Sequence, residues 1–330
     1  MRVHKRFSCM LLVAIMFISV FASCGSAAAA AKPPAGYPSK PITVIVSFAA
    51  GGGTDIGSRI LLKYAERFVG RPLNVINIDG GGSEIGVTQL KNSPNDGYTI
   101  GGFNSASIML TARRKAQYDP VADFEPICLQ VNDPRLFAFK ADDNRFNTLD
   151  EMVTYAKANP GQLLIGTSGA GTTGHFSIAA FNHYAGVDVK AVHFGGAGES
   201  KAAFLGGHVD GIAQTIGEVT QMVEEGQAKV VGILSEERFP QFPDAQTFKE
   251  IGIDLVMNSA RGYVAPKGTP MEIVEFLADC FRQAMEDPDY LRDMQNLGLP
   301  SVYMPPSTYK PFIAAEKKAF DEMCSTIVLK

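Results

Sequence analysis

The chain has 330 residues, of which 46% are hydrophobic and 19% are charged, and its formal net charge is −4 at pH 7. This composition is typical of a globular protein, and the length is sufficient for two domains of ordinary size. The weak negative charge argues against nucleic acid or an acidic membrane surface as a general partner.

The beginning of the chain has the pattern of a signal peptide. Arg2, Lys5 and Arg6 form a positively charged n-region. The apolar stretch that follows, over residues 10–21, is too short to span a bilayer. We therefore expect the chain to be exported and to work in the periplasm or another extracytoplasmic space.

The segment Phe21-Ala22-Ser23-Cys24-Gly25 is similar to a bacterial lipobox, in which the cysteine is acylated after cleavage just before it. We expect residues 1–23 to be removed, Cys24 to be lipidated, and residues 24–36 to form a tether to the membrane. The alternative is a plain secretory signal that is cleaved within residues 27–31, where small residues accumulate.

A strand, a glycine loop and a helix follow one another over residues 41–68. The β-branched run over residues 42–46 predicts a buried strand, and apolar residues at helical spacing after Asp55 predict a helix. The glycines at 51–53 leave backbone N–H groups uncovered, and the helix start adds partial positive charge. This unit predicts an anion-binding loop. The expected ligand contacts from it are Phe48, Ala49, Ala50, Gly52, Thr54 and Asp55.

Asp55 has two interpretations. Asp55 and Thr54 are both good helix N-caps, and capping is the role that we expect for Asp55. The alternative is a contact between Asp55 and the ammonium group of an amino-acid ligand.

Two further strands lead toward the same edge of the predicted sheet. Residues 73–78 form the second strand, which is followed by glycines at 80–82 and a short helix. A third strand over residues 98–103 ends at Asn104 and Ser105. Ligands of open α/β sheets bind at the carboxyl ends of strands, so we expect both residues to contribute to the site.

The alternation of strands and helices restarts at about residue 133. A strand over residues 136–140 precedes a helix that Thr148 and Glu151 open as a capping box. The next strand, over residues 163–167, leads into a second glycine-rich loop before a helix. Backbone and hydroxyl donors make this loop a second predicted anion site. Its expected ligand contacts are Ser168, Gly169, Ala170, Gly171, Thr172, Thr173 and His175.

The remaining strands and helices complete two α/β lobes. The strand over residues 189–194 ends at Gly195 and Gly196, and the strand over residues 209–214 ends at Gln214, so we add these three residues to the expected site. The chain then crosses back near residues 258–266.

Lobe 1 is predicted to contain residues 37–132 and 258–330, and lobe 2 residues 133–257. Helices expected over residues 270–285, 288–296 and 307–323 would pack on lobe 1.

The loop over residues 168–175 also matches two enzyme motifs. Its glycines at 169, 171 and 174 match a dinucleotide fingerprint, but the next acid, Asp188, comes too early for the ribose contact. Ser168 lies in a segment one residue short of a nucleophile elbow, and no later histidine is singled out as its partner. We therefore expect no enzyme activity. An exported hydrolase that uses Ser168 is the alternative.

Metal and cofactor sites are not indicated. The five histidines have no metal-ligand spacing, and Cys128, Cys280 and Cys324 form no C-x-x-C pair. We expect neither a metal nor a cofactor. Cys280 and Cys324 lie on apolar faces of predicted helices, where buried free thiols are expected and a single bridge between them is the alternative.

Arg261 and His175 each have two interpretations. Arg261, just before the return crossing, is either a solvated or hinge-pairing arginine or a bidentate partner for a second ligand carboxylate. His175 either donates a hydrogen bond to the ligand or caps and packs its own helix. Neither glycine loop contains Lys or Arg, so we expect dipoles to hold the anion and salt to weaken binding only slightly.

The order and spacing of these segments resemble those of the solute receptors of tripartite tricarboxylate transporters, also called the Bug family. The resemblance covers residues 37–323. The segments that carry it are Tyr37-Pro38-Ser39-Lys40-Pro41-Ile42, Gly51-Gly52-x-x-Asp55, Asp96-Gly97-Tyr98-Thr99, Ala156-Lys157-Ala158-Asn159-Pro160-Gly161, the loop over residues 168–175, Leu205-Gly206-Gly207-His208-Val209-Asp210 and Ala265-Pro266-Lys267-Gly268-Thr269-Pro270.

The resemblance implies a two-lobe, type II-like periplasmic-binding-protein fold with the ligand cleft between the lobes. Such a receptor closes on a small organic mono- or dicarboxylate and delivers it to separate membrane permease subunits. The two binding loops of the family correspond to residues 48–55 and 168–175. We expect a monomer that works in transport, and a carboxylate sensor feeding a signalling partner is the alternative.

The chain departs from the family pattern around the pocket. The family usually has prolines at Ala49 and Ala50, and its sequence also differs at residues 77–83, at residues 193–196 and near Arg261. These departures leave the receptor role in place and the identity of the carboxylate open.

Overall fold

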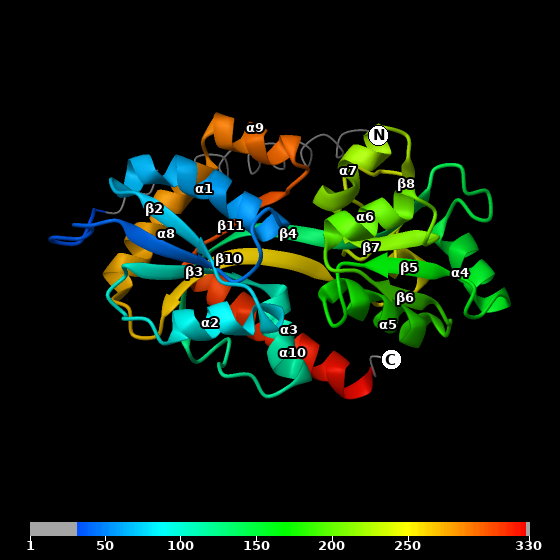
Figure 1. Cartoon of the computed structure of the whole chain (residues 1–330), viewed down its shortest axis with the longest axis horizontal. Coiled ribbons are helices and arrows are strands. Elements are labelled where there is room, and N and C mark those ends of the chain that lie inside the picture. Colours follow the sequence, from blue (N-terminus) through cyan, green and yellow to red (C-terminus); the bar gives the residue numbers. More distant parts are fainter. Residues whose placement is uncertain (1–31, 328–330) are drawn as a thin grey trace, which may run out of the picture. The chain divides into compact units, whose positions relative to one another are not determined.

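Residues 32–327 form an eleven-stranded mixed β-sheet with helices on both of its faces (Figure 1). The computed structural model describes residues 32–327. The predicted signal peptide, the predicted lipidation site at Cys24 and most of the predicted tether lie outside the described residues.

The N-terminal strands build the first section of the sheet. β1 (Ile42–Val46) lies between β2 (Leu73–Asn77) and β3 (Thr99–Asn104), and all three strands are parallel. β10 (Asn258–Pro266) pairs antiparallel with β3, at the predicted return crossing. The carboxyl ends of β1 and β3 therefore lie at one edge of the sheet, beside the helices that follow them.

β4 (Phe124–Lys140) joins the first section of the sheet to the second. Its first part pairs with β10 and with β11 (Ser301–Met304). Its last part pairs with β7 (Gly211–Thr215) and β8 (Ala228–Ile233). One continuous strand thus carries the chain through both sections (Figure 1).

The prediction of a strand over residues 136–140 alone was incomplete. Pro126 and the run Asn132-Asp133-Pro134 are typical of turns. The sequence pattern therefore did not predict the first part of β4 as a strand. The ladder between β4 and β10 accommodates this irregular sequence through shifts of register after Arg261 and after Tyr263.

The second section of the sheet lies beyond β7. β5 (Leu164–Thr167) is parallel to β6 (Lys190–His193) and to β7, and the short β9 (Gln246–Thr247) extends β8. The main path of the sheet therefore has the order β2-β1-β3-β10-β4-β7-β5-β6. This α/β architecture agrees with the predicted fold class.

Helices follow most of the strands, as the alternation predicted. In the first section these are α1 (Gly53–Val69), the turn η1 (Gly81–Ser83), α2 (Glu84–Lys91) and α3 (Ser105–Arg113). In the second section they are α4 (Leu149–Ala158), α5 (Thr173–Ala185), α6 (Ala197–Leu205), α7 (Ile216–Glu224) and the turn η2 (Lys249–Ile251). The predicted capping box of Thr148 and Glu151 opens α4.

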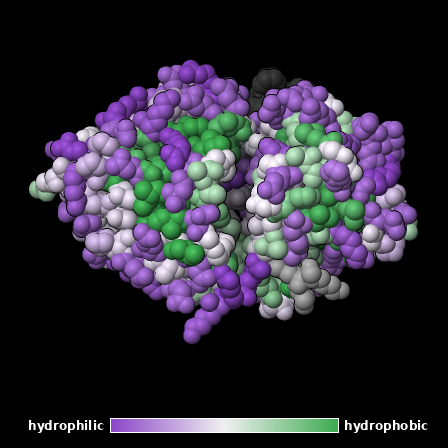
Figure 2. Space-filling view, in the orientation of Figure 1, coloured by the Kyte–Doolittle hydropathy of each residue, from purple (hydrophilic) through white to green (hydrophobic). Residues whose placement is uncertain are grey.

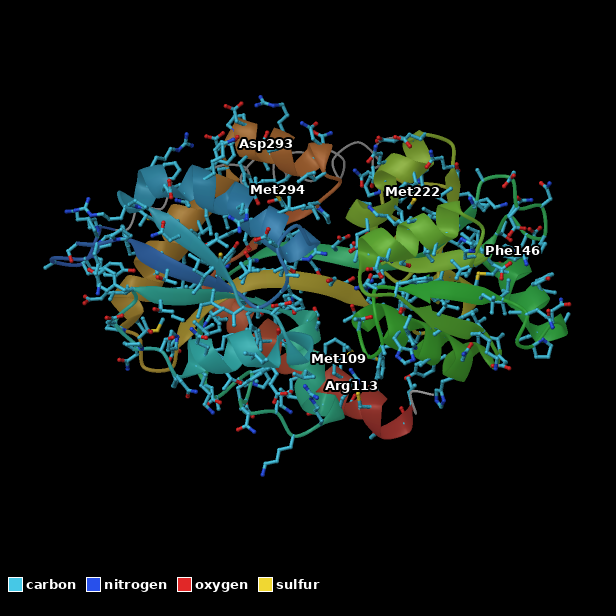
Figure 3. The ribbon with its side chains drawn as sticks, in the orientation of Figure 1. Met109, Arg113, Phe146, Met222, Asp293 and Met294 are labelled. Carbon is cyan, nitrogen blue, oxygen red and sulfur yellow. The ribbon has the colours of Figure 1, made fainter. Side chains whose placement is uncertain are left out.

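The last three helices return to the first section of the sheet. α8 (Met271–Met285) and α9 (Pro288–Asn296) pack against α1, and α10 (Pro306–Thr326) packs against α3 and β4. Figure 3 marks α9 by Asp293 and Met294, and α3 by Met109 and Arg113. The helices predicted at the C-terminus therefore cover both faces of the first section.

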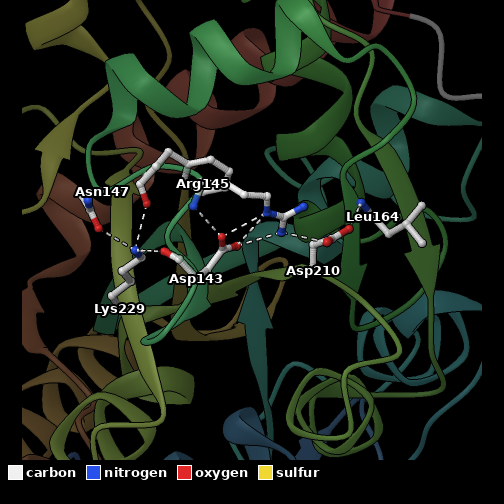
Figure 4. A network of polar contacts seen from close by, with 7 residues as sticks. Asp143, Arg145, Asn147, Leu164, Asp210 and Lys229 are labelled. Carbon is white, nitrogen blue, oxygen red and sulfur yellow. Dashed lines mark hydrogen bonds and ion pairs between the residues drawn. The ribbon is translucent and has the colours of Figure 1, made fainter.

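A polar network fixes the loop between β4 and α4 to the second section (Figure 4). Arg145 joins Asp143 to Asp210, and Asp210 also accepts the backbone N–H of Leu164 at 2.8 Å. Lys229 donates to the carbonyl oxygens of Asp143 and Phe146 and to the side chain of Asn147. Asp210, from a segment that carried the family resemblance, therefore has a structural role away from the cavity described below.

The described residues group as one compact unit, and the predicted boundaries of two lobes stay a prediction. Within the described part of the chain, no helix has the length and apolar character needed to cross a membrane. Cys128, Cys280 and Cys324 are free, so Cys280 and Cys324 are not bridged.

Candidate functional site

A cavity of about 1020 Å³ opens between the two sections of the sheet. Figure 2 shows the surface hollowed near the middle of this face. The lining comes from both sections. It includes the loop after β1, the loop before α5, the start of α6, the solvent-facing side of α7 and the turn after α9. The cavity is therefore built by segments that are far apart in the sequence.

The first wall of the cavity is the start of α1, where no side chain caps the helix. Gly52 is the N-cap, with an extended backbone at φ −78° and ψ 164°. We predicted Thr54 or Asp55 as the cap, and the helix starts earlier because Gly53 already has helical geometry. Gly51, with φ +81°, makes the turn that precedes it. The amide groups of the first turn are thus available to an anion.

Asp55 closes the loop from behind and does not line the cavity. Its carboxylate accepts hydrogen bonds from Gly51 N, Arg59 Nε and Asn77 Nδ2. Burial alone would raise the pKa of Asp55, but these three donors outweigh it and hold the pKa below its usual value. Asp55 is therefore part of the loop's own framework, and an ammonium contact is not supported.

The second wall of the cavity is the start of α5. Thr172 is the N-cap, and its hydroxyl accepts from His175 N and donates to Gly169 O. Gly169 and Gly171 have φ values of +137° and +73°, which L side chains rarely adopt. The loop thus turns sharply, and Ser168, Thr172 and Thr173 face the cavity.

A buried arginine stands behind each of these helix starts. Arg261, from β10, is 8% exposed, and a Cβ atom added at Gly53 would lie 3.5 Å from its Nη2 atom. Arg135, from β4, is 7% exposed and donates from Nη2 to Thr173 Oγ1 at 2.5 Å. Both side chains line the cavity. The cavity therefore contains guanidinium groups beside the two helix starts, in addition to the loops without Lys or Arg that the sequence predicted, and Glu218 and Glu224 also line it.

Asp133, on β4, forms an ion pair with Arg261 and is fully buried. Its Oδ2 atom is 3.6 Å from Arg261 Nη1. Burial raises the pKa of Asp133 to about 6, Arg261, the hydroxyl of Thr215 and Arg135 oppose this rise, and the negative charge of Glu218 adds to it. Burial likewise lowers the pKa of Arg135. Arg261 and Arg135 line the cavity, whereas Asp133 is fully buried next to Arg261, where water screens charges weakly.

The cavity brings together twelve of the residues that the sequence predicted. They are Phe48, Ala49, Ala50, Gly52, Thr54, Asn104, Ser168, Thr172, Thr173, Gly195, Gly196 and Arg261. Seven other predicted contacts do not line it: Asp55, Ser105, Gly169, Ala170, Gly171, His175 and Gln214.

The predicted residues outside the cavity support its walls. Gln214 accepts a hydrogen bond from Ser168 Oγ at 2.9 Å. Ser105 accepts from Ala260 N and donates to Glu316. Ser168 thus donates to a glutamine and not to a histidine, which gives no geometric support to the hydrolase alternative.

His175 packs inside the second wall. Its Nδ1 atom accepts the N–H of Gly171 at 3.0 Å, and its ring centre is 4.2 Å from that of His193. Burial lowers the pKa of His193. Of the two interpretations of His175, the structure supports capping and packing.

Sequence reasoning missed several lining residues. Arg135 carried a signal, because a charged residue inside an apolar strand requires a buried partner or a ligand. Lys201 and Glu218 lie on short helices whose orientation the sequence does not specify. The turn over residues 295–299 reaches the cavity only through the packing of α9 on α1. Among the described residues, no cluster of His, Cys, Asp and Glu suited to a metal was found.

Comparisons with known proteins identify the family of this chain. A model of the family described as "Tripartite tricarboxylate transporter family receptor" matches residues 58–329. The UPF0065 protein in the gbd 5' region of Cupriavidus necator is 34% identical over 298 residues, which cover 90% of each chain.

Two solved structures are similar over nearly the whole described chain. A periplasmic transporter has a TM-score of 0.81 and 28% identity, and the match covers 89% of this chain and 100% of that chain. MatC from Rhodopseudomonas palustris, solved with bound malate, has a TM-score of 0.76 and 26% identity, with 87% and 100% covered. These matches confirm the resemblance seen in the sequence: the chain belongs to the tripartite tricarboxylate transporter receptor family, a family of periplasmic solute-binding proteins.

Proposed function

We propose that this protein is an extracytoplasmic solute receptor that binds a small organic carboxylate between its two sheet sections and delivers it to the membrane permease of a tripartite tricarboxylate-type transporter. One observation carries the proposal. The starts of α1 and α5 open into the same cavity, and each has a buried arginine behind it. A carboxylate matches this set of donors in both charge and hydrogen-bonding capacity.

The available donors are sufficient for useful affinity. A hydrogen bond to a charged group contributes on the order of 1.5–3 kcal/mol. Four or five such bonds exceed the roughly 8 kcal/mol that micromolar binding requires, and the remainder offsets the cost of ordering loops and ligand. No covalent chemistry is needed, so the protein acts as a receptor and not as an enzyme.

We infer delivery to a permease from the fact that the cavity has two walls. A ligand that touches both walls favours the arrangement in which the walls are close together, and a permease can recognise that arrangement. Lobe 1 would comprise residues 37–132 and 258–330, and lobe 2 residues 133–257. Acylation at Cys24 would keep the monomeric receptor at the membrane. The malate bound to MatC supports a carboxylate as ligand.

Calorimetric titration of the purified protein tests the proposal. The panel contains malate, succinate, glutarate and acetate, with succinamide as a neutral control of the same length as succinate. We expect single-site binding and a higher melting temperature with at least one carboxylate, and neither effect with succinamide. The proposal is wrong if no carboxylate binds, or if succinamide binds as well as succinate.

A further inference from the structure

Three consecutive cations, Arg113, Arg114 and Lys115, are exposed where α3 ends, and the proposed binding site does not use them. Arg114 forms an ion pair with Glu84 at 2.7 Å. Arg113 and Lys115 have no carboxylate partner within the described part of the chain. The helix dipole favours a cation in the last turn, but its effect falls off beyond that turn, where Lys115 lies. These three residues, the basic run, therefore need another explanation.

Arg113 is the member of the basic run that contacts the second section of the sheet (Figure 3). Its Nη1 atom donates to Gly171 O at 2.5 Å, in the loop that forms the second wall of the cavity. A carboxylate binds a guanidinium group more strongly than a neutral carbonyl does, because it carries charge and can accept two parallel hydrogen bonds. Since Arg113 is exposed, an acid group from solvent can reach it and compete with Gly171.

The acids on neighbouring elements do not neutralise the basic run. Glu84 is held by Arg114 and also accepts the backbone N–H of Gln117. On α10, which packs against α3, Asp321 accepts from Lys317 at 2.7 Å. The run is thus a local positive patch on a chain whose net charge is −4. Such a patch attracts an acidic partner and orients it on approach.

A segment of protein with Asp or Glu side chains matches this patch better than an anionic membrane surface does. Basic clusters that bind lipid headgroups generally contain about four to eight Lys and Arg residues. The basic run has three, and one of them is already paired. Two adjacent arginines instead suit the planar, two-oxygen geometry of a side-chain carboxylate.

We propose that the basic run is a docking site for an acidic segment of the membrane permease, and that a carboxylate of this segment takes Arg113 from Gly171. The second wall then loses a contact with the first section, so docking lowers the affinity of the receptor for its ligand. This inference rests on the proposed function and goes beyond it, because it assigns a contact surface and couples that surface to release.

A deca-glutamate peptide tests the coupling in the purified protein. We expect a saturating concentration of the peptide to raise the dissociation constant of the carboxylate that binds most tightly by at least about threefold. Because coupling is reciprocal, the peptide should bind the ligand-free protein more tightly than the loaded protein by the same factor. Sodium chloride at equal ionic strength, and a neutral glycine–serine peptide of the same length, should have no such effect.

The variant Lys115→Glu reverses one charge of the basic run. Lys115 does not line the cavity, so ligand affinity without peptide should stay within about twofold of the native value. The effect of the peptide should disappear. In cells that take up the labelled carboxylate through this receptor, the initial rate should fall at least about fivefold. Lys157→Glu, at an exposed position of α4, is the matched control and should keep both the peptide effect and the uptake.

The outcomes separate this inference from the proposed function. The inference is wrong, and carboxylate binding stands, if the peptide leaves the ligand affinity of the native protein unchanged. It is also wrong if the effect persists in Lys115→Glu, which would place the peptide in the cavity, or if this variant supports native uptake. Binding of the native protein, but not of Lys115→Glu, to phosphatidylcholine vesicles with about one third phosphatidylglycerol would assign the run to lipid headgroups and overturn the inference. If no carboxylate binds the native protein, the proposed function fails and the inference fails with it.

Discussion

Gly52 shows how a single residue can keep a helix start open for a ligand. Its backbone is extended, and a Cβ atom added there would have Ala49 O, at 3.5 Å, as its nearest neighbour. Geometry therefore permits a side chain at this position. The glycine is explained by function, because a capping side chain would occupy the amides that we assign to the ligand.

The substitution Gly52→Asp should lower ligand affinity without lowering the stability of the fold. Aspartate is a good N-cap, so the melting temperature should stay constant or rise, by an amount equivalent to a few tenths of a kcal/mol. Its carboxylate would accept the same N–H groups and repel an anionic ligand, so affinity should fall at least about a hundredfold. Calorimetry with the carboxylate that binds the native protein measures this change.

Gly52→Ala is the matched control, because it adds a side chain without an acceptor. Its affinity should stay within a few-fold of that of the native protein. Equal binding by Gly52→Asp and Gly52→Ala would show that the start of α1 is not a ligand contact.

Asp133 should make binding depend on pH. Burial already raises its pKa to about 6, and a ligand carboxylate placed beside it would raise the pKa further. Binding would then be accompanied by uptake of a proton, so the dissociation constant should increase as pH rises from about 6 to 8. Titrations in buffers of different ionisation enthalpy count the protons.

In the variant Asp133→Asn the side chain at this position is neutral at all pH values, so the proton uptake on binding should be abolished. Near pH 5, where Asp133 is mostly protonated, the variant and the native protein should bind with similar affinity. Proton uptake that persists in Asp133→Asn would place the linked group elsewhere.

At the scale of elements, α3 contacts the loop before α5. Arg113, at the end of α3, donates from Nη1 to Gly171 O at 2.5 Å, across the boundary between the two sheet sections. A Cβ atom added at Gly171 would collide with Arg113 at 1.9 Å, so the glycine permits this approach. The contact holds the second wall of the cavity near the first section.

Arg113→Ala should therefore loosen the second wall. A charge-assisted hydrogen bond at an exposed position contributes about 1 kcal/mol, so carboxylate affinity should fall roughly fivefold. Arg114→Ala is the control, because Arg114 binds Gly81 and Glu84 within the first section. Calorimetric titration of both variants measures their carboxylate affinity. An equal loss of affinity in Arg113→Ala and Arg114→Ala would contradict a specific role for Arg113.

Helix α10 carries Glu316, a half-buried acid whose carboxylate is shielded from solvent. Ser105 donates to Glu316 Oε1 at 2.6 Å, whereas Oε2 is buried without a partner among the described residues. Burial raises the pKa of Glu316 to about 7, and the hydrogen bond from Ser105 only partly opposes this. A raised pKa in an acid means stability that is fully present at low pH and lost as pH rises through 7.

Glu316→Gln should remove this loss. At pH 8 the variant should be more stable than the native protein by about 1–3 kcal/mol, and its free energy of unfolding should vary less between pH 6.5 and 8. Asp133 titrates below this window. Denaturant unfolding at several pH values measures the difference. Glu322→Gln, at an exposed position of the same helix, should change stability by less than about 0.5 kcal/mol. Parallel curves for native protein and Glu316→Gln would contradict the assignment.

The pattern of apolar and polar residues predicted most helices and strands, because the residues that determine each of them are neighbours in the sequence. The β-branched run of β1 and the capping box of α4 were sufficient to locate those two elements. β4 was only partly predicted, since Pro126 and Pro134 are turn residues that a long-range ladder with β10 overrides.

At the scale of the whole molecule, the cavity depends on contacts that no local pattern contains. The two glycine loops could be predicted as anion sites, because a strand, a glycine run and a helix start are adjacent in sequence. Arg135 and Arg261 come together only through the pairing of β4 with β10, which joins residues more than a hundred positions apart. The two guanidinium groups that line the cavity therefore could not be derived from the loops alone.

The two sections meet at a second place besides Arg113. A Cβ atom added at Gly217, at the start of α7, would lie 2.9 Å from Gly298 O in the turn after α9. Together with Arg113 and Gly171, this contact holds the sections close together around the cavity. A ligand bound between the walls should stabilise this arrangement further.

The central claim is that one ligand contacts both helix starts at once. Amide NMR during a titration with the carboxylate that binds most tightly tests it directly, through the N–H signals of Gly53 and Thr54 in α1 and of Thr173 and Gly174 in α5. The account predicts that the signals of both pairs shift together, with a single dissociation constant. Shifts confined to one helix start, or absent from both while the ligand binds, would contradict it.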